Sequence, residues 1–347
     1  MSDESVLMGP RKTTINSVST VGGAHCETTA LRALLSPAGV DLSEPMLFGL
    51  GSGLSFIYWD SKQQGLPFLG GRVKPFQLTR NLAERLKLEL RVQETGSPRK
   101  AWDQVRSSID EGVPVGLQLD SYDLEYFGSP VRFAGHIVAM YGYDAERAYL
   151  VDTAQQGGAV STSVESLARA RAARGPMSAR HRSFTLEVAA SDLDDGHVIP
   201  AIIPALTSCA QDFLAPPIAN LGSRGISTAA TRVQAWFDRV EDPERDLAVI
   251  ARLMERAGTG GALFRNLYRD FLTECRGLLD GEPGADLVEQ GRDLFTESAL
   301  LWTSVAHLIE RAGVTGNPDH LREASHVLEE IATIEISAMT ALSSLVE

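Results

Sequence analysis

Hydrophobic and polar positions repeat with two different periods along the chain, and the pattern changes near residue 190. Apolar residues at helical spacing predict helices over 26–36, 76–88, 98–112 and 162–175. Short runs rich in β-branched and other apolar residues predict strands over 113–120, 135–144, 148–154 and 182–189. The first part of the chain is therefore expected to be an α+β domain over residues 1–195.

The second part shows almost no strand pattern. Amphipathic stretches predict helices over 231–240, 243–258, 260–281, 286–312 and 319–346. Asp242 is the expected N-cap of one of them, with Pro243 at its first position. The segment 191–206, which contains Pro200 and Pro204, is interpreted as a junction. An all-α helical domain over residues 196–347 follows.

Two details of helix geometry are also expected. Thr162 and Glu165 have the spacing of a capping box, which predicts a helix start at Thr162. One apolar stripe of the 260–281 helix consists of Leu263, Phe264, Leu267, Tyr268, Phe271 and Leu272.

Composition narrows the class of protein. The chain has 347 residues, 44% hydrophobic content and a net charge of −13, which argues against general binding to nucleic acids or anionic membranes. No apolar run reaches the roughly 18 residues of a membrane helix, and the first residues lack a signal-peptide core. A cytoplasmic protein is expected. Three cysteines, an odd number, favour free thiols over disulfides, and their spacing matches no zinc site.

Cys26 is the strongest candidate for chemistry. It follows Gly22 and Gly23 and begins a predicted helix, so the N–H groups of the first turn can lower the pKa of its thiol. A thiol nucleophile also needs an imidazole as base and a third group that orients the imidazole. Cys209 and Cys275 are interpreted as buried apolar residues.

His136 and Asp152 are the candidate base and acid, and they lie on successive predicted strands. A three-residue loop at 144–146 would place Val138 opposite Asp152. His136 and Asp152 would then share a face, with Cβ atoms about 7 Å apart. A two-residue loop would place them on opposite faces.

Several segments carry a more specific signal. Five of them follow one another along the chain in this order: HCETTALRALL, GLGSGLSFIYW, DSYDLEYF, GHIVAMYGYD and LVDTA. Together they resemble the N-terminal domain of the butirosin biosynthesis protein H family, and GTGGALFRNLYRDFLTE resembles the helical domain of uncharacterised function that often follows it. The order of cysteine, histidine and acid also resembles the papain-like cysteine peptidase fold.

This resemblance implies a papain-like acyltransferase followed by an all-α helical domain that packs against the catalytic cleft. The family moves an aminoacyl group from a carrier-protein thioester to an amine of an aminoglycoside. Cys26 would be acylated, His136 would shuttle protons and Asp152 would orient it. The donor would be the phosphopantetheine arm of an acyl carrier protein, with no other cofactor and no metal.

Two positions depart from the expected patterns. Papain-like peptidases usually place a glutamine, the second oxyanion donor, where this chain has Thr20. His25, beside the nucleophile, is a second candidate for that role. In DLEYF, Glu125 stands where the family pattern has proline, so substrate contacts at this segment are expected to differ.

Other residues have both a binding and a structural interpretation. The candidates for substrate contact are Phe56, Tyr58 and Trp59 as walls of an acyl pocket, Asp120, Tyr122 and Tyr126 at an acceptor site, and Arg265 and Tyr268 near the glycine-rich helix start. The structural alternative for the first group is a plain strand after a glycine-rich loop, and for the second group it is loop anchoring. For the glycine-rich helix start it is close packing of the helix. The glycine-rich start could also hold an anion.

A basic cluster stands out on this acidic chain. It comprises Arg169, Arg171, Arg174, Arg180 and Arg182, together with His181. Such a cluster is usually a solvated face, and the alternative is a docking surface for an acidic carrier protein.

The sequence therefore predicts acyl transfer through a Cys26 thioester to a small-molecule amine in specialised-metabolite biosynthesis. An internal amine would give cyclising release, and water would give a thioesterase. The alternatives are a cysteine peptidase or amidase with the same triad, and a non-catalytic binding protein. The oligomeric state stays open, with a homodimer as one option.

Overall fold

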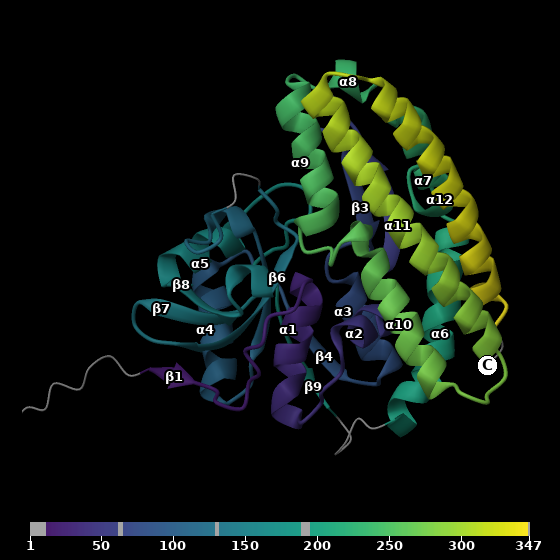
Figure 1. Ribbon diagram of the computed structural model, residues 1–347. Coiled ribbons are helices and arrows are strands. Elements are labelled where there is room, and N and C mark those ends of the chain that lie inside the picture. The colour runs from purple at the N-terminus through teal and green to yellow at the C-terminus, as the bar shows by residue number, and fades with distance from the viewer. Residues whose placement is uncertain (1–11, 62–64, 129–131, 189–194, 346–347) are drawn as a thin grey trace, which may run out of the picture. The chain divides into compact units, whose positions relative to one another are not determined.

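The computed structural model describes residues 12–61, 65–128, 132–188 and 195–345 (Figure 1). The chain forms two compact units, each made of separate segments. The sheet unit runs over Met1–Asp41, Lys74–Phe76 and Lys87–Asp192, and the helical unit over Leu42–Val73, Gln77–Leu86 and Leu193–Glu347. The two units do not meet at one boundary near residue 195, because residues 42–73 and 77–86 pack with the helices of the second half of the chain.

The sheet unit contains a seven-stranded sheet, and the strand pairs among the described residues are antiparallel. Its strands are β1 (Thr13–Thr14), β4 (Glu89–Gln93), β5 (Val115–Leu119), β6 (His136–Tyr143), β7 (Arg147–Val151), β8 (Ala159–Ser163) and β9 (Ser183–Glu187). The order is β4-β9-β5-β6-β7-β8, and β1 pairs with β6. Its helices are α1 (Cys26–Leu35), α4 (Pro98–Asp110) and α5 (Val164–Ala172). The predicted α+β class is confirmed.

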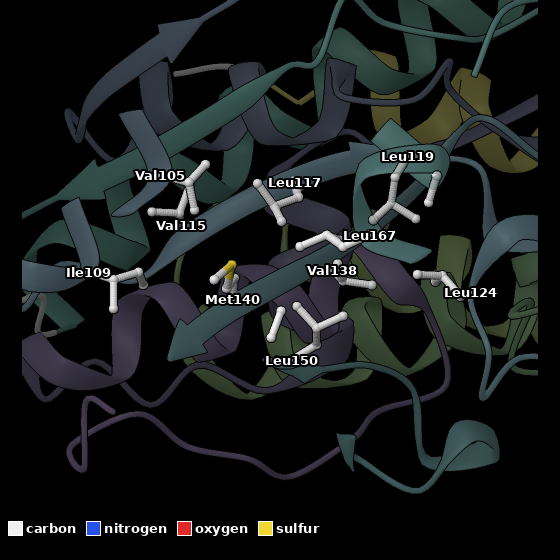
Figure 2. Close-up of a cluster of buried hydrophobic side chains, with 12 residues drawn as sticks. Val105, Ile109, Val115, Leu117, Leu119, Leu124, Val138, Met140, Leu150 and Leu167 are labelled. Carbon is white, nitrogen blue, oxygen red and sulfur yellow. The ribbon is translucent and has the colours of Figure 1, made fainter. Parts of the chain in front are cut away.

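Helices α4 and α5 pack on one face of this sheet (Figure 2). The buried cluster between these two helices and the sheet consists of Val105, Ile109, Val115, Leu117, Leu119, Leu124, Val138, Met140, Ala148, Leu150, Leu167 and Ala170. Alternate residues of β5 and β6 contribute to it, as strand geometry requires. Burial of these side chains fixes the register of the two central strands.

Helix α1 packs against β6 and its neighbours. No residue of α1 belongs to the cluster under α4 and α5, so α1 covers the opposite face. Every residue of α1 except Arg32 is buried, and Gly39 in the left-handed region follows the short 3₁₀ turn Ser36–Ala38 that ends it. The predicted helix over 26–36 is confirmed, and its first residue is Cys26.

The loop between β6 and β7 consists of residues 144–146, as expected, but the strand pairing next to it is shifted by one residue. Tyr143 pairs with Ala148, and the Asp144 carboxylate accepts the N–H groups of Glu146 and Arg147 at 2.9 and 2.8 Å. This register, continued unchanged, would place the side chains of residues 136 and 152 on opposite faces of the sheet.

A β-bulge at Tyr141 corrects the register. Beyond it, Ala139 pairs with Val151, so the next pair along the strands joins the positions of Val138 and Asp152. The predicted alignment is therefore present, but it results from a shifted pairing at the turn and a bulge together.

Helix α5 begins one residue later than expected. Ser163, and not Thr162, is its N-cap, because the Ser163 hydroxyl accepts the N–H of Ser166 at 3.1 Å. The Thr162 hydroxyl instead donates to the Ser166 hydroxyl at 2.8 Å.

The helical unit combines helices with one hairpin. Its elements are α2 (Glu44–Leu50), β2 (Leu54–Trp59), β3 (Phe68–Arg72), α3 (Gln77–Arg85), α6 (Asp195–Leu214), α7 (Gly222–Val233), α8 (Trp236–Arg239), α9 (Pro243–Arg256), α10 (Arg265–Leu278), α11 (Ala285–Thr315) and α12 (Asp319–Ser343). The two longest helices, α11 and α12, pack side by side (Figure 1). Asp242 caps α9 as predicted, accepting the N–H of Arg245.

Two details of this unit differ from the sequence interpretation. The boundary between the units lies at Asp192–Leu193, inside the segment 191–206 that was expected as a junction, but Pro200 and Pro204 lie within helix α6. Leu263 and Phe264 precede α10 with φ of 49° and 75°, in the left-handed region, so they are buried but do not continue the apolar stripe of that helix. Within the described residues, no helix has the length and apolarity needed to cross a membrane.

Candidate active site

The N-terminus of α1 presents Cys26 in a tightly held turn. His25 is the N-cap in an extended conformation. Its carbonyl oxygen accepts the hydroxyls of Thr28 and Thr29 at 3.0 and 2.7 Å, and the Thr29 N–H at 3.0 Å. Both threonines are buried, so they fix the backbone just before the sulfur. Sequence reasoning missed this role of the two threonines.

Glycines bring this turn against the segment that follows Asp152. A Cβ atom at Gly22 would lie 2.4 Å from the Ala154 nitrogen, and one at Gly158 would lie 2.8 Å from the Thr20 oxygen. The Ala154 N–H also donates to the Gly23 oxygen at 2.8 Å. Close backbone contact of this kind requires glycine.

His136 and Asp152 form a buried hydrogen-bonded pair. The Nε2 atom of His136 lies 2.9 Å from Oδ2 of Asp152, and the two side chains are 5% and 0% exposed. The sequence predicted this proximity from the strand register, and the distance shows that the side chains do meet.

Further groups complete the surroundings of the pair. Oδ1 of Asp152 accepts the Thr153 N–H at 2.7 Å, and Oδ2 accepts the Tyr126 hydroxyl at 2.8 Å. The ring of Phe127 meets the His136 ring edge to face, with centroids 5.0 Å apart. Tyr126 was expected at an acceptor site, and the structure instead joins it to the acid.

Electrostatics links Cys26 to this pair. Burial favours the neutral His136 ring, but the charge of Asp152, the charge of Cys26 and hydrogen bonds to both raise the pKa of His136 to about 10. Burial opposes ionisation of Asp152, and His136, Thr153 and Tyr126 outweigh it and lower the pKa of that carboxyl. The three predicted residues therefore form one coupled system of thiol, imidazole and carboxylate.

The other two cysteines lie in different surroundings. Burial raises the pKa of Cys209 to about 12 and raises that of Cys275 well above its ordinary value. Both thiols are therefore held in the neutral form, which is unreactive toward electrophiles.

The two oxyanion candidates are both close to the nucleophile turn. The His25 ring is 1% exposed, and its Nδ1 atom lies 3.4 Å from the Thr28 hydroxyl of the same helix. Thr20 contributes a backbone oxygen that lies against Gly158. Both residues are positioned by the turn.

The aromatic residues of β2 belong to the helical unit. Phe56 is fully buried against Trp302, with centroids 5.4 Å apart, and Tyr58 is buried against Trp236. Trp59 is 46% exposed. Phe56 therefore has no free surface to offer a substrate, which favours its structural interpretation.

Tyr58 does reach a cavity. A polar cavity of about 260 Å³ in the helical unit is lined by Tyr58, Asp60, Asn220, Thr228 and Arg232. Its lining is polar and charged, which does not suit the hydrocarbon part of an acyl chain.

The expected acceptor-site residues 120 and 122 anchor a loop. Asp120 is buried, and its Oδ1 atom accepts the N–H groups of Tyr122 and Phe133 at 3.0 and 2.9 Å. Tyr122 is 46% exposed and stacks under Arg132, whose guanidinium carbon lies 4.2 Å from the ring centroid. Glu125, at the position of the family's proline, accepts the N–H and hydroxyl of Ser163.

Arg265 and Tyr268 are both fully buried in the helical unit. Arg265 donates to both carboxylate oxygens of Glu335 at 2.8 Å. Glu255 accepts the Ala262 N–H at 3.3 Å, at the glycine-rich segment that was considered for an anion. Arg265 is therefore held inside the helical unit by its ion pair with Glu335, and its guanidinium is not available to a ligand.

The basic cluster is not one surface. Arg171 is buried and donates to the carbonyl oxygens of Ala101 and His181, and burial lowers its pKa to about 10. Arg182 pairs with Glu94 at 2.7 Å. Arg171 therefore cannot contact a carrier protein, and the exposed members are Arg169, Arg174 and Arg180.

Two family models match the chain, one after the other. Residues 25–153 match the family model of the N-terminal domain of butirosin biosynthesis protein H. Residues 165–342, just over half of the chain, match a domain of unknown function, DUF4872. No curated protein matches the chain significantly. The resemblance found in the sequence is thereby confirmed for both parts.

Proposed function

Because the chain belongs to the butirosin biosynthesis protein H-like family, we propose that it is an enzyme of antibiotic-type natural product biosynthesis that transfers an acyl group through Cys26. The acyl donor is a carrier-protein thioester, and the acceptor is an amine. The order of Cys26, His136 and Asp152 supports a papain-like catalytic domain as part of this proposal.

One observation carries the proposal. His136 is hydrogen-bonded to buried Asp152 at 2.9 Å. The raised pKa of His136 depends in part on a hydrogen bond and a charge interaction with Cys26. By linkage, an interaction that favours the protonated ring next to the thiolate also favours the thiolate next to that ring. A nucleophile of this kind suits attack on an activated carbonyl such as a thioester.

In the first step, the Cys26 sulfur attacks the thioester carbonyl and forms a new carbon–sulfur bond. The bond from the carbonyl to the carrier thiol breaks, and the departing sulfur takes the proton of the His136 imidazolium. His136 is then neutral, and Cys26 carries the acyl group. The positive end of α1 favours the oxyanion that forms between these two events.

Acylation itself prepares the second step. A thioester carries no charge, so the contribution of the Cys26 thiolate to the raised pKa of His136 disappears. The neutral imidazole can then accept the proton of an attacking amine. The amine nitrogen bonds to the acyl carbon, the Cys26 sulfur leaves as thiolate, and the imidazolium and thiolate pair is restored.

The carrier needs a docking surface of positive charge if it is acidic. Three arginines of the sheet unit are exposed and fit that requirement: Arg169, Arg174 and Arg180. Arg171 is buried and does not. We include these three arginines in the proposal as carrier contacts.

The test is product formation from defined donors. The full chain is incubated with an aminoacyl carrier protein and a panel of amines, including an aminoglycoside, and the amide is detected by mass spectrometry. The proposal expects an amide whose formation needs both the carrier and Cys26, with Cys26→Ala as the inactive control.

Other outcomes would redirect the assignment. Release of free acid at the same rate with or without amine would indicate a thioesterase. Cleavage of a peptide amide without any carrier would indicate a peptidase or amidase. No Cys26-dependent turnover of any of these donors would contradict an enzymatic role.

A further inference from the structure

Tyr126 and His136 bind the same oxygen of one buried carboxylate. The Tyr126 hydroxyl lies 2.8 Å from Oδ2 of Asp152, and Nε2 of His136 lies 2.9 Å from that atom. Burial, followed by the charge of Asp152, raises the pKa of Tyr126 far above its ordinary value. The phenol therefore keeps its proton at any working pH and acts as the donor.

The chain holds Tyr126 in place on several sides. Residues 120–128 follow β5 and include the 3₁₀ turn Ser121–Asp123. The Ser166 hydroxyl donates to the Asp123 oxygen at 2.7 Å, and Glu125 binds Ser163 at the start of α5. This anchoring orders the segment before any substrate binds, so the bond from Tyr126 to Asp152 is a fixed feature of the fold.

A second donor at Oδ2 changes how the carboxylate acts on the imidazole. When one hydrogen bond partly neutralises the negative charge of a carboxylate oxygen, that oxygen stabilises the donor of a second hydrogen bond less strongly. The charge of Asp152 therefore favours the protonated ring of His136 less than it would with a single donor at Oδ2. The reaction needs such moderation, because the imidazolium has to release the proton of its other nitrogen, Nδ1, in one step and recover a proton there in the next.

We propose that Tyr126 is a positioning residue that fixes Oδ2 of Asp152 toward His136 and limits how strongly that carboxylate favours the protonated ring. The benefit of this arrangement for catalysis rests on the proposed function. The effect of Tyr126 on the pKa of His136 depends only on the Asp152 and His136 pair.

The groups that act on His136 come from three elements. Asp152 follows β7, Cys26 begins α1, and Tyr126 lies in the segment after β5 and also interacts with Cys26. The ring of Phe127 is uncharged. Removal of the Cys26 thiol, as in Cys26→Ala, thus leaves Asp152 and its Tyr126 contact as the main influences on the titration of His136.

The experiment is a titration of His136 by NMR in the full chain with ¹³Cε1-labelled histidine. The reference is Cys26→Ala, which lacks the thiolate as the acylated enzyme would. The test variant adds Tyr126→Phe, and the matched control adds Tyr122→Phe at an exposed ring. The His136 signal is assigned by its loss in Cys26→Ala with His136→Asn.

We expect Tyr126→Phe to raise the pKa of His136 by about 1 and Tyr122→Phe to leave it unchanged. An unchanged or lower value in the Tyr126 variant would overturn the inference, since loss of packing alone predicts no such rise. If Tyr126→Phe does not fold, 3,5-difluorotyrosine at position 126, a stronger donor, should lower the value, and no change would again overturn it. These titrations need no acyl donor, so failure of acyl transfer and failure of this inference are separate results.

Discussion

The backbone of Gly22 lies directly against that of Ala154, so closely that a Cβ atom at Gly22 would come within 2.4 Å of the Ala154 nitrogen. Gly22 belongs to the turn before Cys26, and Ala154 follows Asp152 by two residues. The contact therefore sets the distance between the nucleophile turn and the strand that carries the acid.

Gly22→Ala should separate these two segments. A methyl group cannot fit 2.4 Å from a backbone atom, so the turn or the 153–154 segment has to move. We expect a loss of about 1–3 kcal/mol in the free energy of unfolding, measured by urea denaturation, and slower alkylation of Cys26. Gly96→Ala is the matched control because no atom lies within 4 Å of its Cβ position. Equal stability of the two variants would show that the contact is not tight.

His136→Ala should slow alkylation of Cys26 by iodoacetamide near neutral pH. Removal of the imidazolium removes the positive charge that stabilises the thiolate, and the rate should fall by about tenfold or more. Peptide mapping distinguishes Cys26 from Cys209 and Cys275, whose raised pKa values predict slow reaction in the native protein. Equal Cys26 rates in wild type and variant would remove His136 as its partner.

The stability that His136 contributes should depend on pH in a defined direction. Against the effect of burial, Asp152 and Cys26 raise its pKa from 6.5 to about 10. Folding therefore favours the protonated ring, and this contribution is fully present below about pH 6.5 and is lost as the pH rises through about 10. The difference in unfolding free energy between wild type and His136→Gln should shrink over this range in urea titrations. A difference that is constant with pH would contradict the coupling.

Arg265→Ala should destabilise the helical unit strongly. Glu335 is fully buried, and among the described residues the variant leaves it the Ser298 hydroxyl and the Trp302 N–H as donors. Removal of one member of a buried ion pair costs about 3–5 kcal/mol. Arg269→Ala, which breaks a partly exposed pair with Asp270, should cost below about 1 kcal/mol. Similar thermal unfolding of the two variants would contradict a structural role for Arg265.

Local patterns were sufficient to predict the elements that carry the candidate triad. The spacing of apolar residues predicted α1, and the alternating strands placed His136 and Asp152 on one face. The sequence did not reveal the bulge at Tyr141, because one extra residue in a strand that is buried on both faces leaves no mark in the apolar pattern. The expected alignment resulted from two deviations that cancel.

Contacts between distant segments account for most of what was missed. Nothing local to Tyr126 indicates that its hydroxyl reaches Asp152, and nothing local to Arg171 indicates burial beneath the basic cluster. Pro200 and Pro204 favour a helix end by local propensity, yet α6 continues through both, which shows that tertiary packing outweighs propensity there.

The mass of Cys26 after exposure to a donor tests the central claim most directly. The full chain is mixed with an acyl carrier protein loaded with an aminoacyl thioester, quenched in acid and digested, and the peptide that contains Cys26 is examined by mass spectrometry. We predict an increase equal to the acyl group on Cys26, absent from Cys209 and Cys275 and reversed by added amine. An unmodified Cys26 peptide in the absence of amine, from a preparation that transfers the acyl group of the carrier once amine is added, would contradict the claim.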